Sequence, residues 1–482
     1  MTADNGARSG ATIPQVSDDS TPEYTAVCDD ALGSMDLVDA VSALARGDVS
    51  GAELTAASVE RAREADTRLN AVVTWVPPVV ATEGPFAGVP SFLKDNEDLA
   101  GFATSHGSRA TSRNPADHTG AFATEYQALG LRFLGKTTLP EFGLTAATEP
   151  LAQGPTRNPW NLSRSTGGSS GGSAALVAAG VAPIAHANDG GGSIRIPASC
   201  CGLVGLKPTR GRVTPPAGIE SLPVQIAEHG VLTRSVRDTA LFYREYEQLR
   251  NGAGEFEPLS PVTGPSARRL RIGVAVNGLG GLPVAPEVAS TVLETALLCE
   301  GLGHSVEQLP LPFDQQVGKD FLRYWAFLAL ALEFAGGRVY GPDFHREELE
   351  PFTRGLSRFC RSVAPSIPAS LRRLRRFELD YARAFDRFDV LLTPVLAHEP
   401  PPIGYLAPDI DFDTHLLRLL RYASFTAMQN ISGAPAISMP LGRSSDGLPI
   451  GVQAAAGVGQ DARLLELAFE LEAATNPAGQ RP

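Results

Sequence analysis

Hydrophobic and polar positions along the chain change repeatedly between the spacing of an amphipathic helix and that of a buried strand. Close to the front, apolar residues recur at helical spacing at Leu37, Val38, Val41 and Leu44. The sequence Ser50-Gly51-Ala52-Glu53 then forms a capping box, which predicts a second helix that runs to about Asp66. We expect these two helices to pack outside a sheet or against a partner subunit.

The second half of the chain carries a clear alternation of strand and helix patterns. Residues 270–276, 286–302 and 304–309 predict a strand, a helix and a strand, which together form a β-α-β unit. The remaining apolar segments predict further strands and a closing helix at 388–394, 425–440, 448–454 and 464–474. Because strand and helix patterns alternate throughout, we assign the chain to the α/β class.

The chain divides only weakly into parts. Residues 1–30 are polar and lack periodicity, so we expect a flexible N-terminal tail. Residues 31–482 are expected to form a single domain, although 251–268 have the glycine- and proline-rich composition of an internal linker. Residues 315–388 follow helical patterns and contain many aromatic residues. We expect them to cover the sheet, either as plain core packing or as one wall of a substrate site.

Composition limits the classes of partner. Of the 482 residues, 43% are hydrophobic and 20% charged, and the net charge of −12 disfavours nucleic acid or an anionic membrane as partner. The densest basic run, 372–376, lies among acidic residues and is interpreted as a solvated helix face. The first residues lack the apolar region of a signal peptide, and the most apolar run, 174–187, is too short to span a bilayer. We therefore expect a cytoplasmic protein with no nucleic-acid or membrane partner.

The cysteine and histidine patterns do not indicate disulfide or metal chemistry. The five cysteines are odd in number, and a bridge between adjacent Cys200 and Cys201 would be strained, so we expect reduced thiols. The eight histidines form no HExxH motif or other ligand pair. We expect neither a metal nor a cofactor.

Two glycine-rich turns stand out in the middle of the chain. Residues 167–172 and 190–193 bracket the small-residue run 174–187. Glycine loses more conformational entropy on folding than other residues, so such a concentration needs a physical reason. The turns either permit tight packing or bring backbone N–H groups close to a reacting oxygen, as an oxyanion hole requires. The residues alone leave both interpretations open.

A serine hydrolase needs a base that activates its serine. No GxSxG nucleophile elbow precedes a suitably placed acid and histidine, and His186, seven residues before Ser193, has no acid marked to orient it. Lys94 follows apolar residues that predict a strand, and burial there would lower its pKa and provide a neutral amine. The alternative is that Lys94 points to water. Asp95 would favour the charged lysine if both faced one way, but neighbours on a strand point to opposite faces.

The chain resembles the amidase signature family at Lys94, at Gly168-Ser169-Ser170-Gly171-Gly172-Ser173 and at Asp189-Gly190-Gly191-Gly192-Ser193-Ile194-Arg195. The spacings agree, with 75 residues from Lys94 to Ser169 and 24 from Ser169 to Ser193. The similarity covers roughly residues 36–475. It implies the amidase signature fold, a large mixed and twisted β-sheet core with helices on both faces.

The resemblance also implies a Ser–cis-Ser–Lys catalytic triad that cleaves amides through an acyl-enzyme. Ser193 would be the nucleophile, Ser169 the middle serine in an unusual cis geometry, and Lys94 the base.

The same resemblance implies roles for the residues around the triad. An oxyanion hole would be formed by the N–H groups of Gly190, Gly191, Gly192 and Ser193. Ser170 would have a structural role, and Asp189 with Arg195 would brace the second glycine turn.

Within the family, Asn188-Asp189-Gly190 and the segments 196–201 and 207–212 are similar to the branch of nylon-oligomer (6-aminohexanoate cyclic dimer) hydrolases and urethane-cleaving amidases. This similarity implies a small-molecule substrate: a hydrophobic, aryl or oligomeric secondary amide, with carbamates and esters as additional substrates. A homodimer is a further expectation from the family.

Two other functions are considered. The chain could be the amidase-like subunit of a tRNA-dependent amidotransferase, but the acidic composition lacks the basic surface expected for tRNA. A catalytically inactive scaffold is disfavoured because all three positions of the implied triad are present.

Overall fold

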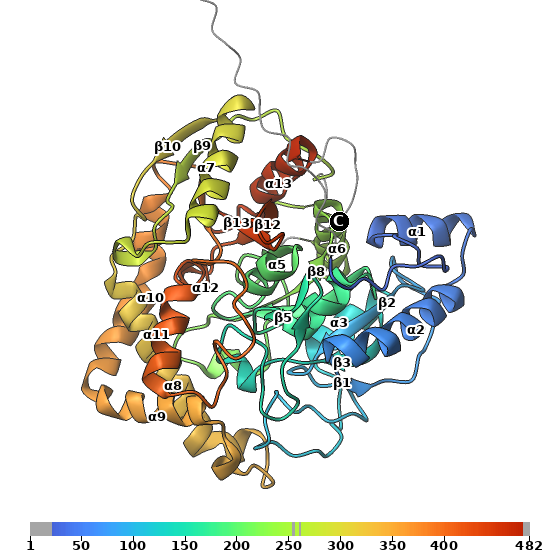
Figure 1. Cartoon of the computed structure of the whole chain (residues 1–482), viewed down its shortest axis with the longest axis horizontal. Helices are drawn as coiled ribbons and strands as arrows, with labels where there is room; N and C mark the ends of the chain where they lie inside the picture. Colours follow the sequence, from blue (N-terminus) through green and yellow to red (C-terminus); the bar gives the residue numbers. More distant parts are fainter. Residues whose placement is uncertain (1–21, 253–255, 260–261, 476–482) are drawn as a thin grey trace, which may run out of the picture.

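The computed structural model describes residues 22–252, 256–259 and 262–475 (Figure 1). Its strands are β1 (Val72–Trp75), β2 (Pro90–Lys94), β3 (Arg132–Thr137), β4 (Arg157–Asn158), β5 (Asn161–Ser165), β6 (Ile184–Asp189), β7 (Val204–Lys207), β8 (Glu228–Thr233), β9 (Arg271–Val274), β10 (Ser305–Gln308), β11 (Val390–Pro394), β12 (Ala436–Arg443) and β13 (Pro449–Ala455).

The helices are α1 (Leu37–Arg46), α2 (Gly51–Leu69), α3 (Ala121–Ala128), α4 (Gly171–Ala178), α5 (Arg195–Cys201), α6 (Val236–Leu249), α7 (Pro286–Gly301), α8 (Gln316–Val339), α9 (Pro351–Ser362), α10 (Ile367–Ala384), α11 (Phe412–Tyr422), α12 (Ala427–Ser432) and α13 (Asp461–Thr475). Short 3₁₀ turns lie at Glu141–Gly143, Ile219–Ser221, Leu279–Gly281, Arg346–Glu348 and Ala364–Ser366.

An eight-stranded sheet forms the centre of the fold, in the order β10-β9-β11-β13-β12-β7-β8-β6. The pairs β10–β9 and β9–β11 are parallel, and the remaining neighbours are antiparallel, so the sheet is mixed as expected. A separate three-stranded sheet has the order β1-β3-β2, and its edge strand β2 contacts β6, the edge strand of the large sheet.

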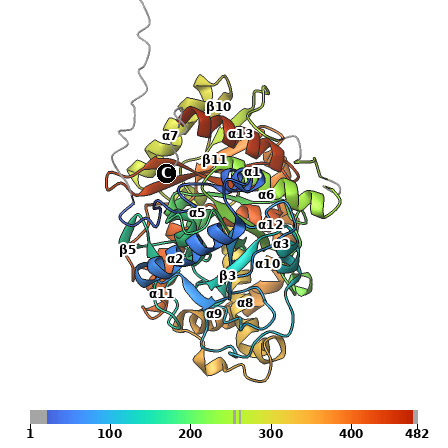
Figure 2. The same ribbon diagram turned by 90° about the vertical axis from the view of Figure 1, so that its right-hand side faces the viewer.

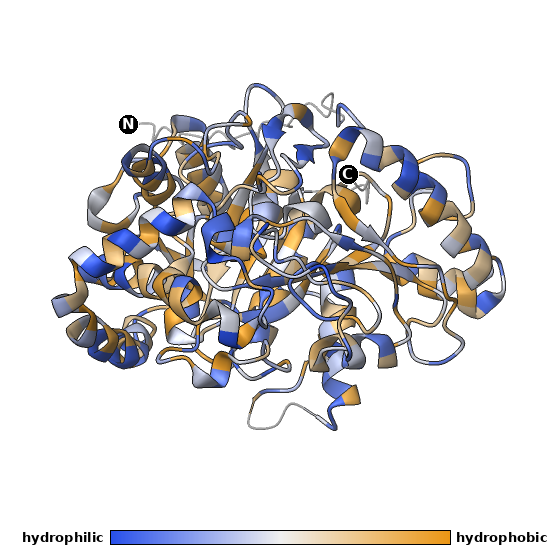
Figure 3. Cartoon of the chain, turned by 90° about the horizontal axis from the view of Figure 1, so that it is seen from below, coloured by the Kyte–Doolittle hydropathy of each residue, from blue (hydrophilic) through white to orange (hydrophobic). Residues whose placement is uncertain are grey.

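Helices cover both faces of the large sheet, which confirms the expected architecture. Val204 and Leu206 of β7 join the same hydrophobic cluster as Phe242 of α6. Gly205 between them faces the other way, where a methyl group would come within 2.8 Å of Ala198 Cβ on α5. Because strand side chains alternate between faces, α6 and α5 lie on opposite sides of the sheet. Figure 3 shows hydrophilic and hydrophobic colours alternating around the peripheral helices, as expected for helices with one side on a core.

The helix starts follow the local sequence signals. At the start of α2, Ser50 Oγ accepts the N–H of Glu53 at 3.2 Å and Glu53 Oε2 accepts the N–H of Ser50 at 2.8 Å, so the predicted capping box is confirmed.

Segment 425–440 was expected to be a strand throughout. This expectation is wrong for the first half of the segment, which forms α12. Gly433, with a φ of 78°, ends that helix before β12 begins.

Segments expected to be loose are partly packed. Residues 1–21 of the expected tail lie outside the described residues, whereas Tyr24 and Ala26 are buried and their N–H groups donate to Pro159 O and Ala179 O. In the expected linker, Leu259 and Val262 are buried in the main hydrophobic cluster. The described parts of both segments are therefore held by the domain, in contrast to the expectation from composition.

Helices α8, α9 and α10 form the cover expected for 315–388, and they lie together at one side of the molecule (Figures 1 and 2). They pack on each other and, through the contact of α10 with α12, on the central part of the fold.

In the described part of the chain, no helix combines the length and apolar character needed to cross a membrane.

Candidate active site

Three separate segments of the chain meet at the candidate site. Lys94 is the last residue of β2, Ser169 and Ser170 directly precede α4, and Ser193 lies in the loop between β6 and α5. The meeting of the two edge strands, β2 and β6, brings these segments together. Residues far apart in sequence therefore share one site because two sheets abut there.

The side chain of Lys94 is completely buried. Its Nζ atom lies within hydrogen-bond distance of three groups, at 2.7 Å from Ser169 Oγ, 2.9 Å from Ser170 Oγ and 2.6 Å from Asn188 Oδ1. Burial lowers the pKa of Lys94 well below the usual lysine value, and the charge of Asp189 offsets only part of this shift. The alternative in which Lys94 points to water is therefore wrong.

Asp95 uses a different set of partners. Its carboxylate lies 2.8 Å from Lys136 Nζ, and it also accepts the N–H of Ser105 at 3.0 Å. Both members of the Asp95–Lys136 pair are fully buried. The negative charge next to Lys94 in sequence is thus paired elsewhere, as the alternation of side chains along a strand predicts.

Ser169 follows a cis peptide bond, which joins Gly168 to Ser169. The geometry implied for this residue by the family resemblance is therefore present. Ser169 is only 3% exposed. The backbone of Gly143 lies against it, since a methyl group built on Gly143 would come within 3.0 Å of Ser169 Oγ.

Ser170 does more than support the turn. Its hydroxyl donates to the carbonyl oxygen of Ser193 at 2.6 Å and accepts from Lys94 Nζ at 2.9 Å. One hydroxyl therefore connects the lysine amine to the backbone of the residue expected to be the nucleophile. Ser193 itself is 8% exposed, and its Oγ makes no hydrogen bond to any other described residue.

The second glycine turn is shaped around the Asp189 carboxylate. Gly192, with a φ of 129°, donates its N–H to Asp189 Oδ1 at 2.7 Å. This differs from the expectation that Gly192 belongs to the oxyanion hole, because its N–H is already engaged. In the described part of the chain, the N–H groups of Gly190, Gly191 and Ser193 donate to no other residue, so these three remain available as oxyanion donors.

A buried ion pair holds this turn. Arg195 Nε and Nη2 lie 2.9 Å from the two carboxylate oxygens of Asp189, and both residues are fully buried. Burial alone would raise the pKa of Asp189, but the charge and hydrogen bonds of Arg195, with a hydrogen bond from Asn430, hold it well below the usual value. The bracing role expected for Asp189 and Arg195 agrees with this geometry.

The residues that complete the brace come from the C-terminal part of the chain. Arg195 donates to Asn430 Oδ1 at 2.7 Å, Gln453 Oε1 at 2.7 Å and Gln429 Oε1 at 3.0 Å. Sequence reasoning assigned no role to these amides, or to Asn188 beside Lys94. For the three amides that contact Arg195, the only available signal was their position in the part of the chain that resembles the family, because each is more than 230 residues from Arg195 in sequence.

Helix α8 contributes an aromatic wall beside the second glycine turn, made of Phe321 and Trp325. Their rings stack with centroids 5.4 Å apart. A methyl group built on Gly191 would come within 3.3 Å of Phe321 Cζ and 3.9 Å of Trp325 Cη2. Trp325 Nε1 also donates to Leu144 O at 3.0 Å, next to the segment that covers Ser169. Of the two interpretations of 315–388, this position supports a wall of the site.

His186, the other candidate base, contacts the backbone of Lys94 and not Ser193. Its Nδ1 accepts the backbone N–H of Lys94 at 3.2 Å, and its Nε2 lies 2.9 Å from His229 Nδ1. Burial lowers the pKa of His186 well below its usual value, and the charges of His229 and Lys94 lower it further.

Within the described residues, no group of three or more His, Cys, Asp or Glu side chains is arranged to hold a metal ion.

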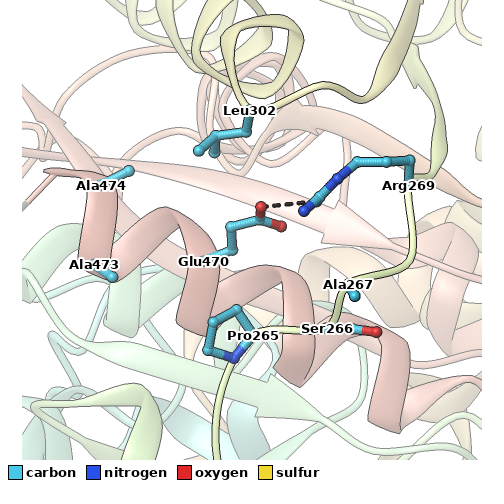
Figure 4. A pocket seen from close by; sticks show the side chains of 8 residues that line it. All are labelled: Pro265, Ser266, Ala267, Arg269, Leu302, Glu470, Ala473 and Ala474. Atoms are coloured by element: carbon cyan, nitrogen blue, oxygen red, sulfur yellow. Dashed lines mark hydrogen bonds and ion pairs between the residues drawn. The ribbon is translucent and has the colours of Figure 1, made fainter.

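A surface hollow of about 500 Å³ lies away from these residues, between the C-terminal helix α13 and the segment before β9 (Figure 4). Arg269 and Glu470 form an ion pair of 2.8 Å across it, and Leu302 lines one side. None of the triad candidates borders this hollow. It is therefore separate from the candidate site.

The amino-acid sequence matches known amidases. The family model described as "Amidase" matches residues 53–465. The chain is 45% identical to "Putative amidase AmiC" of Mycobacterium leprae over 92% of this chain and 96% of the relative.

Two solved structures are also similar to the chain. A 6-aminohexanoate cyclic dimer hydrolase complexed with substrate has a TM-score of 0.80 and 32% identity, over 93% of this chain and 98% of that one. A bacterial aryl acylamidase of the amidase signature family has a TM-score of 0.77 and 27% identity, over 92% and 99%. The chain, with its lysine, cis-peptide serine and glycine-turn serine, therefore belongs to the amidase signature family and is an amidase.

Proposed function

We propose that the chain hydrolyses carboxylic amides with Ser193 as nucleophile, Ser169 as proton relay and Lys94 as base. The observation that carries the proposal is the 2.7 Å hydrogen bond between Lys94 Nζ and Ser169 Oγ in a fully buried setting. A lysine can act as a base only when its amine is neutral, and burial favours the neutral form.

The other two partners of the amine determine which way its lone pair points. Ser170 gives its own proton to the Ser193 carbonyl oxygen, and Asn188 Oδ1 carries no proton, so both accept from the amine. A neutral amine has two N–H groups, which these two acceptors satisfy. Its lone pair is then left for the hydroxyl proton of Ser169.

The reaction follows in two halves. Ser193 Oγ attacks the substrate carbonyl carbon while its proton passes to Ser169 Oγ, whose own proton passes to Lys94 Nζ. Collapse of the tetrahedral intermediate breaks the C–N bond, and the proton returns through Ser169 to the leaving amine. Water then attacks the acyl-enzyme through the same relay and releases the carboxylic acid. The oxyanion is stabilised by the free N–H groups around Gly191, each worth about 3–4 kcal/mol in comparable sites.

We propose hydrophobic, aryl or oligomeric secondary amides as the substrate class, with carbamates and esters as additional substrates. The aromatic wall of Phe321 and Trp325 supports this, because apolar rings bind flat or aliphatic substrate groups better than charged ones. The names of the similar hydrolase and acylamidase structures point to the same class.

A chromogenic anilide tests the proposal. Ser193→Ala should abolish both turnover and acylation by a serine-directed inhibitor, and Lys94→Ala should lose activity most severely near neutral pH. Retained activity in Ser193→Ala would refute the nucleophile assignment. A panel of small amides, anilides, linear and cyclic amide oligomers and carbamates would then define the substrate class.

A further inference from the structure

The seam between the two sheets, where β2 lies beside β6, is joined by side-chain hydrogen bonds and not by a backbone ladder. Strands β2 and β6 contact one another, but each pairs through its backbone only with strands of its own sheet. Ser91 Oγ of β2 donates to Ile184 O of β6 at 2.9 Å. The backbone N–H of Lys94 donates to His186 Nδ1 at 3.2 Å. These two side-chain bonds take the place of ladder bonds between the strands.

The seam matters for the reaction because each strand carries one half of the proposed machinery. Lys94 ends β2, whereas β6 carries Asn188 and leads into the turn that holds Ser193. The distance of the base from the nucleophile therefore depends on how the two strand ends are held. His186 provides that contact at the end of β2.

The proton positions on His186 follow from its partners. A backbone N–H can only donate, so His186 Nδ1 must accept and the ring proton lies on Nε2. That proton points to His229 Nδ1 at 2.9 Å, which places the His229 proton on its own Nε2. His229 Nε2 in turn lies 3.5 Å from Glu97 Oε2. Each ring thus determines the tautomer of the next.

Glu97 also contacts the backbone of Lys94 directly. Glu97 follows Lys94 in the same turn, and its N–H donates to Lys94 O at 3.2 Å. His186, His229 and Glu97 are all buried. The ring of Phe122 on α3 packs against both imidazoles, with centroids 5.0 Å from His186 and 4.3 Å from His229. Buried residues therefore engage both the N–H and the C=O of Lys94, through His186 Nδ1 and the backbone N–H of Glu97.

We propose that His186 is a positioning residue for Lys94, and that His229 acts through it by holding its tautomer. His186 touches neither the amine nor the substrate; it holds the backbone from which the amine reaches Ser169. This inference rests on the proposed function, in which Lys94 is the base.

Two amide substitutions separate the two nitrogens of His186. In His186→Asn the amide oxygen can occupy the place of Nδ1 and still accept the Lys94 N–H. In His186→Gln the amide lies near the place of Nε2, so the contact to His229 can persist while the acceptor for Lys94 is lost. Both variants remove the ring and leave a neutral amide, which makes them a matched pair.

We expect His186→Gln to lose about 10- to 100-fold in kcat with KM within about twofold of the original, because misplacement of a reacting group acts on the chemical step. Its pH profile should shift to higher pH as the lysine becomes better solvated. His186→Asn should retain kcat within about threefold. Equal losses in the two variants, no loss in either, or a loss confined to KM would overturn the inference.

Controls separate this inference from the proposed function. Inactive Ser193→Ala and Lys94→Ala with equal activities of the two His186 variants would overturn the positioning role alone, whereas an active Lys94→Ala would overturn both. If the His186 variants do not fold, His229→Asn and His229→Gln provide the same comparison, since only the former keeps an acceptor at Nδ1. We expect kcat to be higher in His229→Asn than in His229→Gln. Equal values of kcat in the two variants would also refute the inference.

Discussion

Replacing Arg195 with methionine would remove the central cation of the site without changing the length of the side chain greatly. The guanidinium binds both oxygens of Asp189 and reaches Gln429, Asn430 and Gln453. Its loss would leave the Asp189 carboxylate buried without its counter-charge, which typically costs about 3–5 kcal/mol. Activity should fall as well, because Asp189 holds the N–H of Gly192 and hence the shape of the nucleophile turn.

The expected change in melting temperature follows from the size of the protein. Unfolding entropy of about 2.1 cal/mol/K per residue gives roughly 1 kcal/mol/K for 482 residues. A loss of about 3–5 kcal/mol therefore corresponds to a decrease of about 3–5 °C in Tm, measurable by calorimetry or differential scanning fluorimetry. The surface pair Arg271–Asp389, in which Arg271 is 54% exposed, provides the control, and Arg271→Met should change Tm far less.

The pH dependence distinguishes loss of the ion pair from loss of packing. In the native protein the pKa of Asp189 is depressed, so its contribution to stability is present above the unfolded value of about 3.9 and is lost only as pH falls through the lower folded value. In Arg195→Met the pKa of Asp189 should rise, because burial then lacks its main opposing cause. The variant should recover stability relative to the native protein as pH is lowered from 7 to 5. A difference in Tm that stays constant with pH, or a decrease below about 1 °C, would refute the reasoning.

Three further measurements test other parts of the site. Gly192→Ala should reduce both Tm and kcat, because its φ is 129° and the new methyl group would lie 2.4 Å from Thr426 Oγ1, whereas Gly211→Ala, with φ of 86° and nothing within 4 Å, should affect Tm modestly and leave kcat unchanged. Trp325→Ala should raise KM for anilides by about tenfold and alter KM for small aliphatic amides little; equal effects on both would contradict its role as an apolar wall. The acidic limb of kcat/KM should lie well below the usual lysine pKa of about 10.4, since protonation of the Lys94 amine removes the base, and a limb near that value would show that burial does not govern it.

Local signals in the sequence predicted most of the secondary structure because they act over a few residues. The Ser50 capping box and the apolar residues before Lys94 depend on near neighbours, and both elements formed as expected. Residues 425–440 failed because a short apolar run fits a strand and a buried helix equally well. Composition was least informative, since Leu259 in the glycine- and proline-rich segment is buried.

By itself, the sequence determined the α/β class and the glycine turns, and the resemblance of these turns to a family selected Lys94, Ser169 and Ser193 as the candidate triad. These features are carried by residue type and spacing, which a chain displays without being folded. The cis peptide before Ser169 and the separation of Asp95 from Lys94 agreed with expectations formed in this way.

Only the tertiary structure decided which groups surround those residues. The commitment of the Gly192 N–H to Asp189, the amides that meet Arg195 and the histidine beneath Lys94 all depend on contacts between segments that are distant in sequence or on the path of the turn in space. The physical reason is that burial and hydrogen bonding, which set the pKa of Lys94 and the donors left for an oxyanion, exist only once two sheets have met at β2 and β6.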